Sequence, residues 1–281
     1  MIKTTKIITD SSSDLSKDIV SRYNIEVVPT SIYFGDDVYD AEELEKDEFY
    51  KMIDESLVIP KTSSPSPERF MKSYESVQED NILVMNVTSK LSDTYSNAVI
   101  AENIFKQKYP NKNIRVIDTG TGSVGEGLLV VKAAQLLEEG KGFDEVVNTI
   151  ESIKTNIEFY GLLDSLENSI KGGRIDHFVD EVINESNLKI IIKANNGDIK
   201  LCEKVIGEDD SVEKLVKFIH TSIKDKEFKT LAIGHANCHE KALKVKEMIV
   251  KNYNFENVTI SEIGASMGSY TAKGAILISV L

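Results

Sequence analysis

Residues 81–123 read NILVMNVTSKLSDTYSNAVIAENIFKQKYPNKNIRVIDTGTGS, and this stretch decides the fold class. Two short apolar runs of strand length, 81–87 and 113–118, enclose an amphipathic stretch at 91–109 that is typical of a helix and stops at Pro110. Strand, helix and strand in this order predict a βαβ unit with parallel strands. Because parallel sheets have both faces covered by helices, we expect a buried sheet between two helical layers.

The same alternation extends over the first half of the chain. The apolar run 6–8 precedes a polar helical stretch, and helical stretches at 127–140 and 143–154 follow the run that ends at residue 118. We expect residues 1–155 to form an N-terminal α/β/α domain built on a parallel sheet. The full length of 281 residues suits two domains.

The pattern changes after about residue 155. The stretch 188–205 contains two β-rich runs around Asn196-Gly197-Asp198, which is a strong signal for a hairpin turn. Strand-like and helical stretches then alternate again, up to a glycine-containing loop that we expect from residue 265 and a last apolar strand. We therefore expect residues 156–281 to form a C-terminal α/β domain with a mixed sheet.

Charge and cysteine content limit the classes of function. The formal net charge is −13 at pH 7, and an acidic surface repels phosphate backbones and anionic lipids, so we expect neither nucleic acid nor a membrane surface as partner. Two cysteines, Cys202 and Cys238, cannot form a disulfide framework in a chain of this size. We find no secretory signal, and the apolar runs are too short to span a bilayer, so we expect a cytoplasmic protein without stable membrane insertion.

Ser and Thr gather in four clusters, at residues 9–14, 62–67, 88–94 and 118–123. Three of them directly follow strand-like runs, and all four precede helical stretches. Because the carboxyl ends of parallel strands meet at one edge of a sheet, we expect these hydroxyls and nearby helix N-termini to line a crevice that can hold an anion. One cluster alone is explained as a helix N-cap, supplied in the first case by Ser13 or Asp14. Four clusters contain more hydroxyls than caps require.

A glycine-rich loop keeps a second class of function open. Residues Gly120–Gly125 match GxGxxG after a strand-like run and before a helical stretch, as a nicotinamide-dependent oxidoreductase requires. The match is not in the first βαβ unit, and Glu138 and Glu139 lie in the same helical stretch rather than after a following strand. The GxSxG motif of a hydrolase nucleophile does not occur.

Two further groups of residues each have a structural and a functional interpretation. His235, Cys238 and His239 have the spacing of a zinc site on a continuous helix, but His235 directly follows a strand-like run and a fourth ligand is not evident, so we expect no metal. Residues Lys171–Ile175 fit a plain helix C-cap and, equally, a loop that presents Arg174 to a ligand or partner.

Six motifs in order resemble the DegV family: ITDSSSDL (8–15), KTSSPSP (61–67), TSKLSDTYSNA (88–98), VIDTGTGSVGEG (116–127), GGRI (172–175) and GHAN (234–237). The resemblance covers essentially the whole chain. It implies a two-domain α/β fold that holds one long-chain fatty acid between the domains, with the tail mostly in the second. It also implies a carrier rather than an enzyme, without a cofactor, that presents the carboxylate to a separate ATP-dependent fatty acid kinase for phospholipid synthesis.

The resemblance also assigns residues to the headgroup. By position, Thr62 matches the family's threonine of the TSQPS loop, and Ser92 matches its serine of the LSGT segment. We take Ser63, Thr94 and Tyr270 as further headgroup candidates. Arg174 is a candidate contact of the headgroup or of a partner.

Several positions depart from the family pattern, among them Ala272 and Lys273 in place of Gly-Pro. Tyr270 stands in place of the headgroup histidine, Ile206 in place of an arginine, and Asp93 in place of the glycine of LSGT. Loss of charged partners weakens the hold on a carboxylate, although the Tyr270 hydroxyl can donate one neutral hydrogen bond. A divergent carrier of another small lipid or acid, which does not serve a kinase, is therefore the alternative to the family function.

Overall fold

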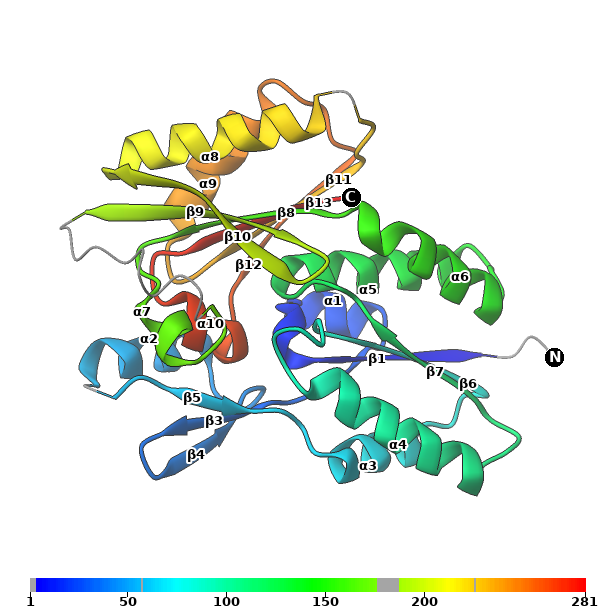
Figure 1. The fold of residues 1–281 in the computed structure, drawn as a ribbon. Coiled ribbons are helices and arrows are strands. Elements are labelled where there is room, and N and C mark those ends of the chain that lie inside the picture. The colour runs from blue at the N-terminus through cyan, green and yellow to red at the C-terminus, as the bar shows by residue number, and fades with distance from the viewer. Residues whose placement is uncertain (1–3, 57, 176–186, 225) are drawn as a thin grey trace.

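Three sheets organise the chain in the computed structural model, which describes residues 4–56, 58–175, 187–224 and 226–281. A four-stranded parallel sheet has the order β2-β1-β6-β7, a six-stranded mixed sheet has the order β10-β9-β8-β13-β11-β12, and a small antiparallel sheet has the order β4-β3-β5. Figure 1 shows the mixed sheet across the top, the parallel sheet at lower right and the small sheet at lower left. The predicted α/β class with one parallel and one mixed sheet is confirmed.

The parallel sheet is buried on both faces. Its strands are β1 (Thr5–Asp10), β2 (Glu26–Val28), β6 (Asn81–Asn86) and β7 (Asn113–Asp118), and every residue of β6 is buried. Alternate side chains enter opposite cores: Leu83 packs on one face and Val84 on the other. The first face is covered by α1 (Lys17–Arg22), α5 (Ser123–Glu138) and α6 (Phe143–Ile153), and the second by α3 (Pro67–Ser76) and α4 (Thr94–Lys108).

The mixed sheet has helices on one face and the first half of the chain on the other. Its strands are β8 (Glu158–Leu163), β9 (Leu188–Asn195), β10 (Asp198–Ile206), β11 (Thr230–His235), β12 (Asn257–Glu262) and β13 (Ile276–Val280). Helices α8 (Glu208–Ile223) and α9 (His239–Val250) cover the outer face. The β9–β10 hairpin turns at Asn196 and Gly197, which both have positive φ, so the predicted turn is correct.

The small sheet was not predicted from the sequence. It consists of β3 (Ser31–Phe34), β4 (Asp37–Asp40) and β5 (Lys61–Ser63), with α2 (Lys46–Glu55) inserted between the last two strands. Strands of three or four residues have too short a pattern to be recognised. The consequence is that Thr62 lies in a strand rather than in a loop.

Two other local predictions were wrong. Residues Ala265–Thr271 form helix α10 instead of a loop. Helix α1 is capped by Ser16, whereas Ser11–Ser13 form a short 3-10 helix (η1) that Asp10 caps. Asp14 is left-handed, with φ of 49°, and its side chain is directed to a distant part of the chain instead of to a helix end.

The predicted division near residue 155 falls in a short 3-10 helix (η2, Lys154–Asn156) between α6 and β8. One hydrophobic core nevertheless includes Leu128 from the first half together with Phe159 and Leu277 from the second. The division into domains 1–155 and 156–281 therefore stays a prediction, and below we speak of a first and a second half. Within the described ranges, no helix has both the length and the apolar character that crossing a bilayer requires.

Candidate functional site

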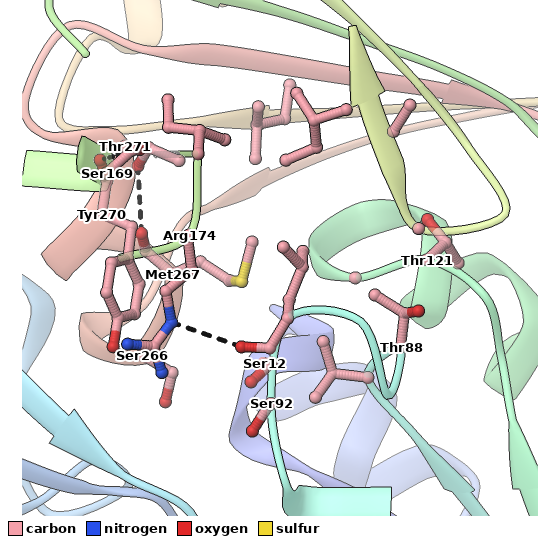
Figure 2. Close-up of a pocket in the computed structure, with 18 of the residues that line it drawn as sticks. Ser12, Thr88, Ser92, Thr121, Ser169, Arg174, Ser266, Met267, Tyr270 and Thr271 are labelled. Carbon is pink, nitrogen blue, oxygen red and sulfur yellow. Dashed lines mark hydrogen bonds between the residues drawn. The ribbon is translucent and has the colours of Figure 1, made fainter. Parts of the chain in front are cut away.

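A pocket lies between the carboxyl ends of the parallel strands and the inner face of the mixed sheet. Its walls are mostly apolar and are formed by Val87, Leu91, Phe159, Leu163, Ile175, Ile192, Ala194, Ile199, Met267 and Leu277. Its polar lining consists of hydroxyl side chains and one guanidinium, contributed by Ser12, Thr30, Thr62, Thr88, Ser92, Thr121, Ser169, Ser266, Tyr270, Thr271 and Arg174. Figure 2 shows Arg174, Tyr270 and Ser169 at one end of this pocket, and Thr88 and Thr121 at the other.

The first end, which we call the head end, is closed by a contact between the two halves. Thr62 Oγ1 on β5 lies 2.5 Å from the hydroxyl of Tyr270 on α10. The guanidinium of Arg174 lies 4.4 Å from the centre of the Tyr270 ring, and its Nε donates to Leu91 O at 3.3 Å. The structure thus brings Thr62, Tyr270 and Arg174 together, although 208 positions separate the first two in the chain.

The 88–94 cluster, in the loop before α4, also contributes to the head end. Ser92 Oγ lies 2.9 Å from Ser64 Oγ and 2.7 Å from Thr94 Oγ1, and it accepts from the Thr94 N–H at 3.2 Å. Ser92 lines the pocket next to Thr62 and Arg174. The Ser64–Ser92 contact brings the 62–67 and 88–94 clusters together, although Thr62 lies on β5 of the small antiparallel sheet and not at the end of a parallel strand.

Other candidate residues lie outside the pocket. Ser63 is exposed and lines a separate outer crevice, whose lining residues are Thr62, Ser63, Ser64, Asp93, Ser96, Asn97 and Arg174. Because Thr62 and Arg174 belong to both linings, the outer crevice adjoins the head end. Ile206 is 63 % exposed at the far end of β10.

Beneath the pocket the two halves are joined by buried hydrogen bonds, at a place that we call the buried junction. Ser11 Oγ lies 2.7 Å from Ser266 Oγ, and Asp14 accepts from the Gly264 N–H at 2.7 Å. Tyr50 donates from its hydroxyl to Ile263 O at 2.9 Å. Ser266 was missed from the sequence because its role depends on a partner 255 positions away, which a local pattern does not indicate.

Burial makes the Asp14 carboxylate costly. It raises the pKa of Asp14 to about 6, against the opposing effects of Lys46, the Ser123 hydroxyl and the Gly264 N–H. The Ser123 hydroxyl donates to the second carboxylate oxygen at 2.5 Å. Asp14 thus connects η1, the start of α5 and the segment before α10.

Two further buried acids, Asp10 and Glu126, lie beneath the strand ends. Asp10 accepts from the N–H groups of Ser12 and Val87, at 2.9 and 3.0 Å, which holds the two strand-end loops together. Glu126 on α5 lies 2.9 Å from the Thr9 hydroxyl, and burial together with the nearby Asp10 charge raises its pKa well above the usual value. Glu126 therefore keeps its proton to a higher pH than an exposed glutamate does.

Two glycines of the GxGxxG loop lie against side chains of the protein itself. A Cβ on Gly122 would lie 3.1 Å from Val87 Cγ2, and one on Gly125 would lie 3.2 Å from the Phe159 ring. In a dinucleotide site this close approach serves the pyrophosphate. Here Val87 and Phe159 take up the space, so the geometry gives the oxidoreductase alternative no support.

The histidines of the proposed zinc pattern have other contacts. His235 ends β11, its Nδ1 accepts from the Cys238 N–H at 3.4 Å, and its Nε2 lies 3.3 Å from His239 Nδ1. Burial lowers the pKa of His235 to about 4 and raises that of Cys238 to about 11. Across the part of the chain that the structure describes, no set of three His, Cys, Asp or Glu side chains is placed to hold a metal ion.

Comparison with known proteins gives one consistent family. A family model described as "Uncharacterised protein, DegV family" matches residues 4–281. A DegV domain-containing protein of Clostridium perfringens is 30% identical over 282 residues, which are 98% of this chain and 96% of that protein.

Two solved structures are similar over nearly their whole length. A DegV family protein from Ruminococcus gnavus, refined with vaccenic acid, has a TM-score of 0.91 at 28% identity, covering 98% of this chain and 99% of that chain. A DegV family protein from Thermus thermophilus, described by its fatty acid binding, has a TM-score of 0.87 at 26% identity, with 98% of both chains covered.

Proposed function

The chain belongs to the DegV family, and on that premise we propose that it binds one long-chain fatty acid in the pocket between its parallel and mixed sheets. The carboxylate lies at the head end, near Thr62, Ser92, Tyr270 and Arg174. The acyl tail lies along the apolar walls.

One observation carries this proposal: an apolar pocket ends in a cluster of hydroxyls and a single guanidinium. A carboxylate accepts hydrogen bonds from such donors, and those to a charged group contribute about 1.5–3 kcal/mol each. The tail gains roughly 25 cal/mol for each Å² of apolar surface removed from water. A ligand with a small anionic head and a long hydrocarbon tail fits both parts.

Two similar proteins support the choice of ligand. The Ruminococcus gnavus protein was refined with vaccenic acid, and the Thermus thermophilus protein is described as binding a fatty acid. In this chain a metal or cofactor has no part in the proposed function.

We propose further that the protein is a carrier and that a separate cytoplasmic kinase acts on its ligand. In that step a carboxylate oxygen attacks the γ-phosphorus of ATP, the bond to the β-phosphate oxygen breaks, and ADP leaves. The outer crevice supports this idea because two residues of the head end, Thr62 and Arg174, also line this crevice at the surface. Ser63 is the headgroup candidate that lines the crevice and not the pocket.

Ligand recovery tests the binding proposal directly. We expect native mass spectrometry or lipid extraction of the purified protein to recover a fatty acid. The double variant Thr62→Val, Ser92→Ala should bind oleate at least tenfold more weakly, whereas Ser63→Ala, on the same strand but outside the pocket, should bind normally. An empty protein that also fails to bind oleate or palmitate would exclude the proposal.

A divergent carrier is the second candidate, and the contact between Tyr270 and Thr62 favours it. This contact already occupies the Thr62 hydroxyl, and Asp93 places a carboxylate in the outer crevice. Acyl-phosphate formation from oleate, with ATP and a fatty acid kinase, separates the two candidates. Turnover with the wild-type protein supports the kinase role, and binding without turnover supports the divergent carrier.

A further inference from the structure

The β9–β10 hairpin forms the wall of the pocket opposite the head end. Ala194, Gly197 and Ile199 of the hairpin line the pocket there, and Thr88, Thr121 and Gly122 line it from the first half. In Figure 2 the hairpin descends toward the loops that contain Thr88 and Thr121. We use the term hairpin tip for residues 195–198.

The hairpin tip is in close contact with two strand-end loops of the first half. A Cβ on Gly197 would overlap Thr88 Oγ1 and would lie 3.2 Å from Lys90 Cβ. A Cβ on Gly120 would lie 2.5 Å from Asn196 Oδ1. The turn therefore fits against the loops because Gly120 and Gly197 lack side chains.

The tip is also held by an ion pair at the surface. Lys90 Nζ lies 2.7 Å from Asp198 Oδ2, with 43% and 61% of the two side chains exposed. Ion pairs at such exposure are screened by salt and contribute little. Contact between the tip and the loops therefore depends mainly on shape.

At the buried junction and in the shared core, the halves are joined much more strongly. The buried junction has hydrogen bonds between Ser11 and Ser266 and between Asp14 and Gly264. Helix α5 packs against β11 and β13 in the shared core. Of these three described contacts, the one at the hairpin tip therefore costs least to open.

We propose that the hairpin tip is the gate through which the acyl tail enters and leaves the pocket, closed by the fit of Gly197 against Thr88 and by the Lys90–Asp198 ion pair. This inference rests on the proposed fatty-acid binding. It adds that the rate of exchange is set at the tip, whereas the hold on the carboxylate is set at the head end. The ligand class at the gate is a flexible hydrocarbon chain.

A wedge at Gly197 tests the gate. Gly197→Ala adds a methyl group that overlaps Thr88 Oγ1, so the tip cannot close fully. We expect transfer of radiolabelled oleate from the loaded protein to phosphatidylcholine vesicles to be faster by about tenfold. Lys90→Ala should accelerate transfer by about twofold, and added salt should accelerate the wild type but not this variant.

The matched control is Gly207→Ala at the other end of β10. Gly207 has φ of +94° and Gly197 has φ of +79°, so both alanines suffer the same kind of backbone strain, but nothing lies within 4 Å of a Cβ on Gly207. Transfer from Gly207→Ala should match the wild type. The double variant Thr88→Ala, Gly197→Ala removes the overlapping hydroxyl and should return transfer toward the wild-type rate.

The outcomes separate the gate from the function on which it rests. Wild-type protein that binds oleate, with equal transfer rates for Gly197→Ala and Gly207→Ala, would overturn the gate and leave fatty-acid binding intact. Wild-type protein that does not bind oleate would overturn both. If Gly197→Ala does not fold, the Lys90→Ala variant and its salt dependence decide, and a transfer rate equal to that of the wild type at every salt concentration would exclude the gate.

Discussion

The two halves of the molecule meet at the buried junction and at the hairpin tip, and these contacts are built in opposite ways. At the junction, Ser11, Asp14 and Ser266 are buried and hydrogen-bonded across the interface. At the tip, a glycine turn rests on a loop beside the exposed Lys90–Asp198 ion pair. Buried hydrogen bonds are costly to break, whereas an exposed ion pair has water as a ready substitute. The molecule therefore separates the contact that holds it together from the contact that is able to open.

This comparison is testable through the free energy of unfolding, measured with denaturant. Substitutions at the junction should change it, each by an amount that its buried groups determine. Removal of the Lys90 side chain, which pairs with Asp198 of the tip, should leave it unchanged. The four predictions below run from the largest expected change to the smallest.

Replacing Asp14 by Asn should stabilise the protein at pH 8 by about 3 kcal/mol. Burial raises the pKa of Asp14 to about 6 from 3.8, so the folded state holds this proton more tightly than the unfolded state does. In the wild type the contribution of Asp14 is present below pH 4 and is lost as the pH rises to 6. Asn keeps the acceptor for Gly264 without the charge.

The measurement for Asp14 is denaturant unfolding between pH 4 and pH 8. The difference between Asp14→Asn and the wild type should grow across pH 4 to 6 and then remain constant. Asp36→Asn, at an exposed position, serves as the control and should show no such growth. A less stable Asp14→Asn at pH 8 would mean that the carboxylate is needed at the junction.

Replacing Tyr50 by Phe should destabilise the protein by about 2 kcal/mol. The ring is fully buried and its hydroxyl donates to Ile263 O, so the variant leaves this carbonyl without its donor. Tyr33→Phe, at an exposed position of the small sheet, is the control. If the two variants are equally stable, the hydrogen bond from Tyr50 to Ile263 O does not contribute to the strength of the junction.

Replacing Ser266 by Ala should cost about 1 kcal/mol. The effect is smaller because Ser11 Oγ keeps a second partner, the Thr30 hydroxyl at 3.1 Å, and still accepts from the Thr30 N–H. The loss of stability is measured from the midpoints of denaturant unfolding. A loss as large as that of Tyr50→Phe would show that Ser11 depends on Ser266 alone.

Replacing Lys90 by Ala should leave the free energy of unfolding unchanged, because both members of the ion pair are exposed to water. The same substitution should change the transfer rate of oleate, as argued for the gate. Circular dichroism during urea unfolding gives the first quantity. A stability loss comparable to that of Ser266→Ala would remove the contrast between the tip and the junction.

The sequence predicted most of the fold because the long strands and helices have strong patterns. Strand β6 was recognised as a continuous apolar run, which is what burial on both faces requires, and the edge strand β7 as a shorter run with buried Ile114, Val116 and Ile117. The small sheet was missed because three- and four-residue strands contain too few residues to establish a period. Helix α10 was missed because its Ser and Gly residues favour loops, and tertiary packing overrides that preference.

The head end was partly predictable for a similar reason. Ser92 belongs to a cluster that follows β6, where the strand-end rule places it, whereas Thr62 lies on β5 of the small antiparallel sheet, which that rule does not cover. The contact of Thr62 with Tyr270 was not predictable, because it joins residues of the two halves across 208 positions. Asp14 was expected as a helix cap, and its left-handed backbone directs the carboxylate to Gly264 instead.

Glu126 provides a natural spectroscopic probe beneath the pocket. Burial raises the pKa of its carboxyl group well above the usual value, and the group lies beside Thr9, at the end of a central strand. A protonated carboxyl absorbs in the infrared at a carbonyl frequency that ionised carboxylates do not share, and the frequency responds to hydrogen bonding. Vibrational difference spectra of the empty and loaded protein, with Glu126→Gln to assign the band, would therefore report movement of the strand ends without any attached label.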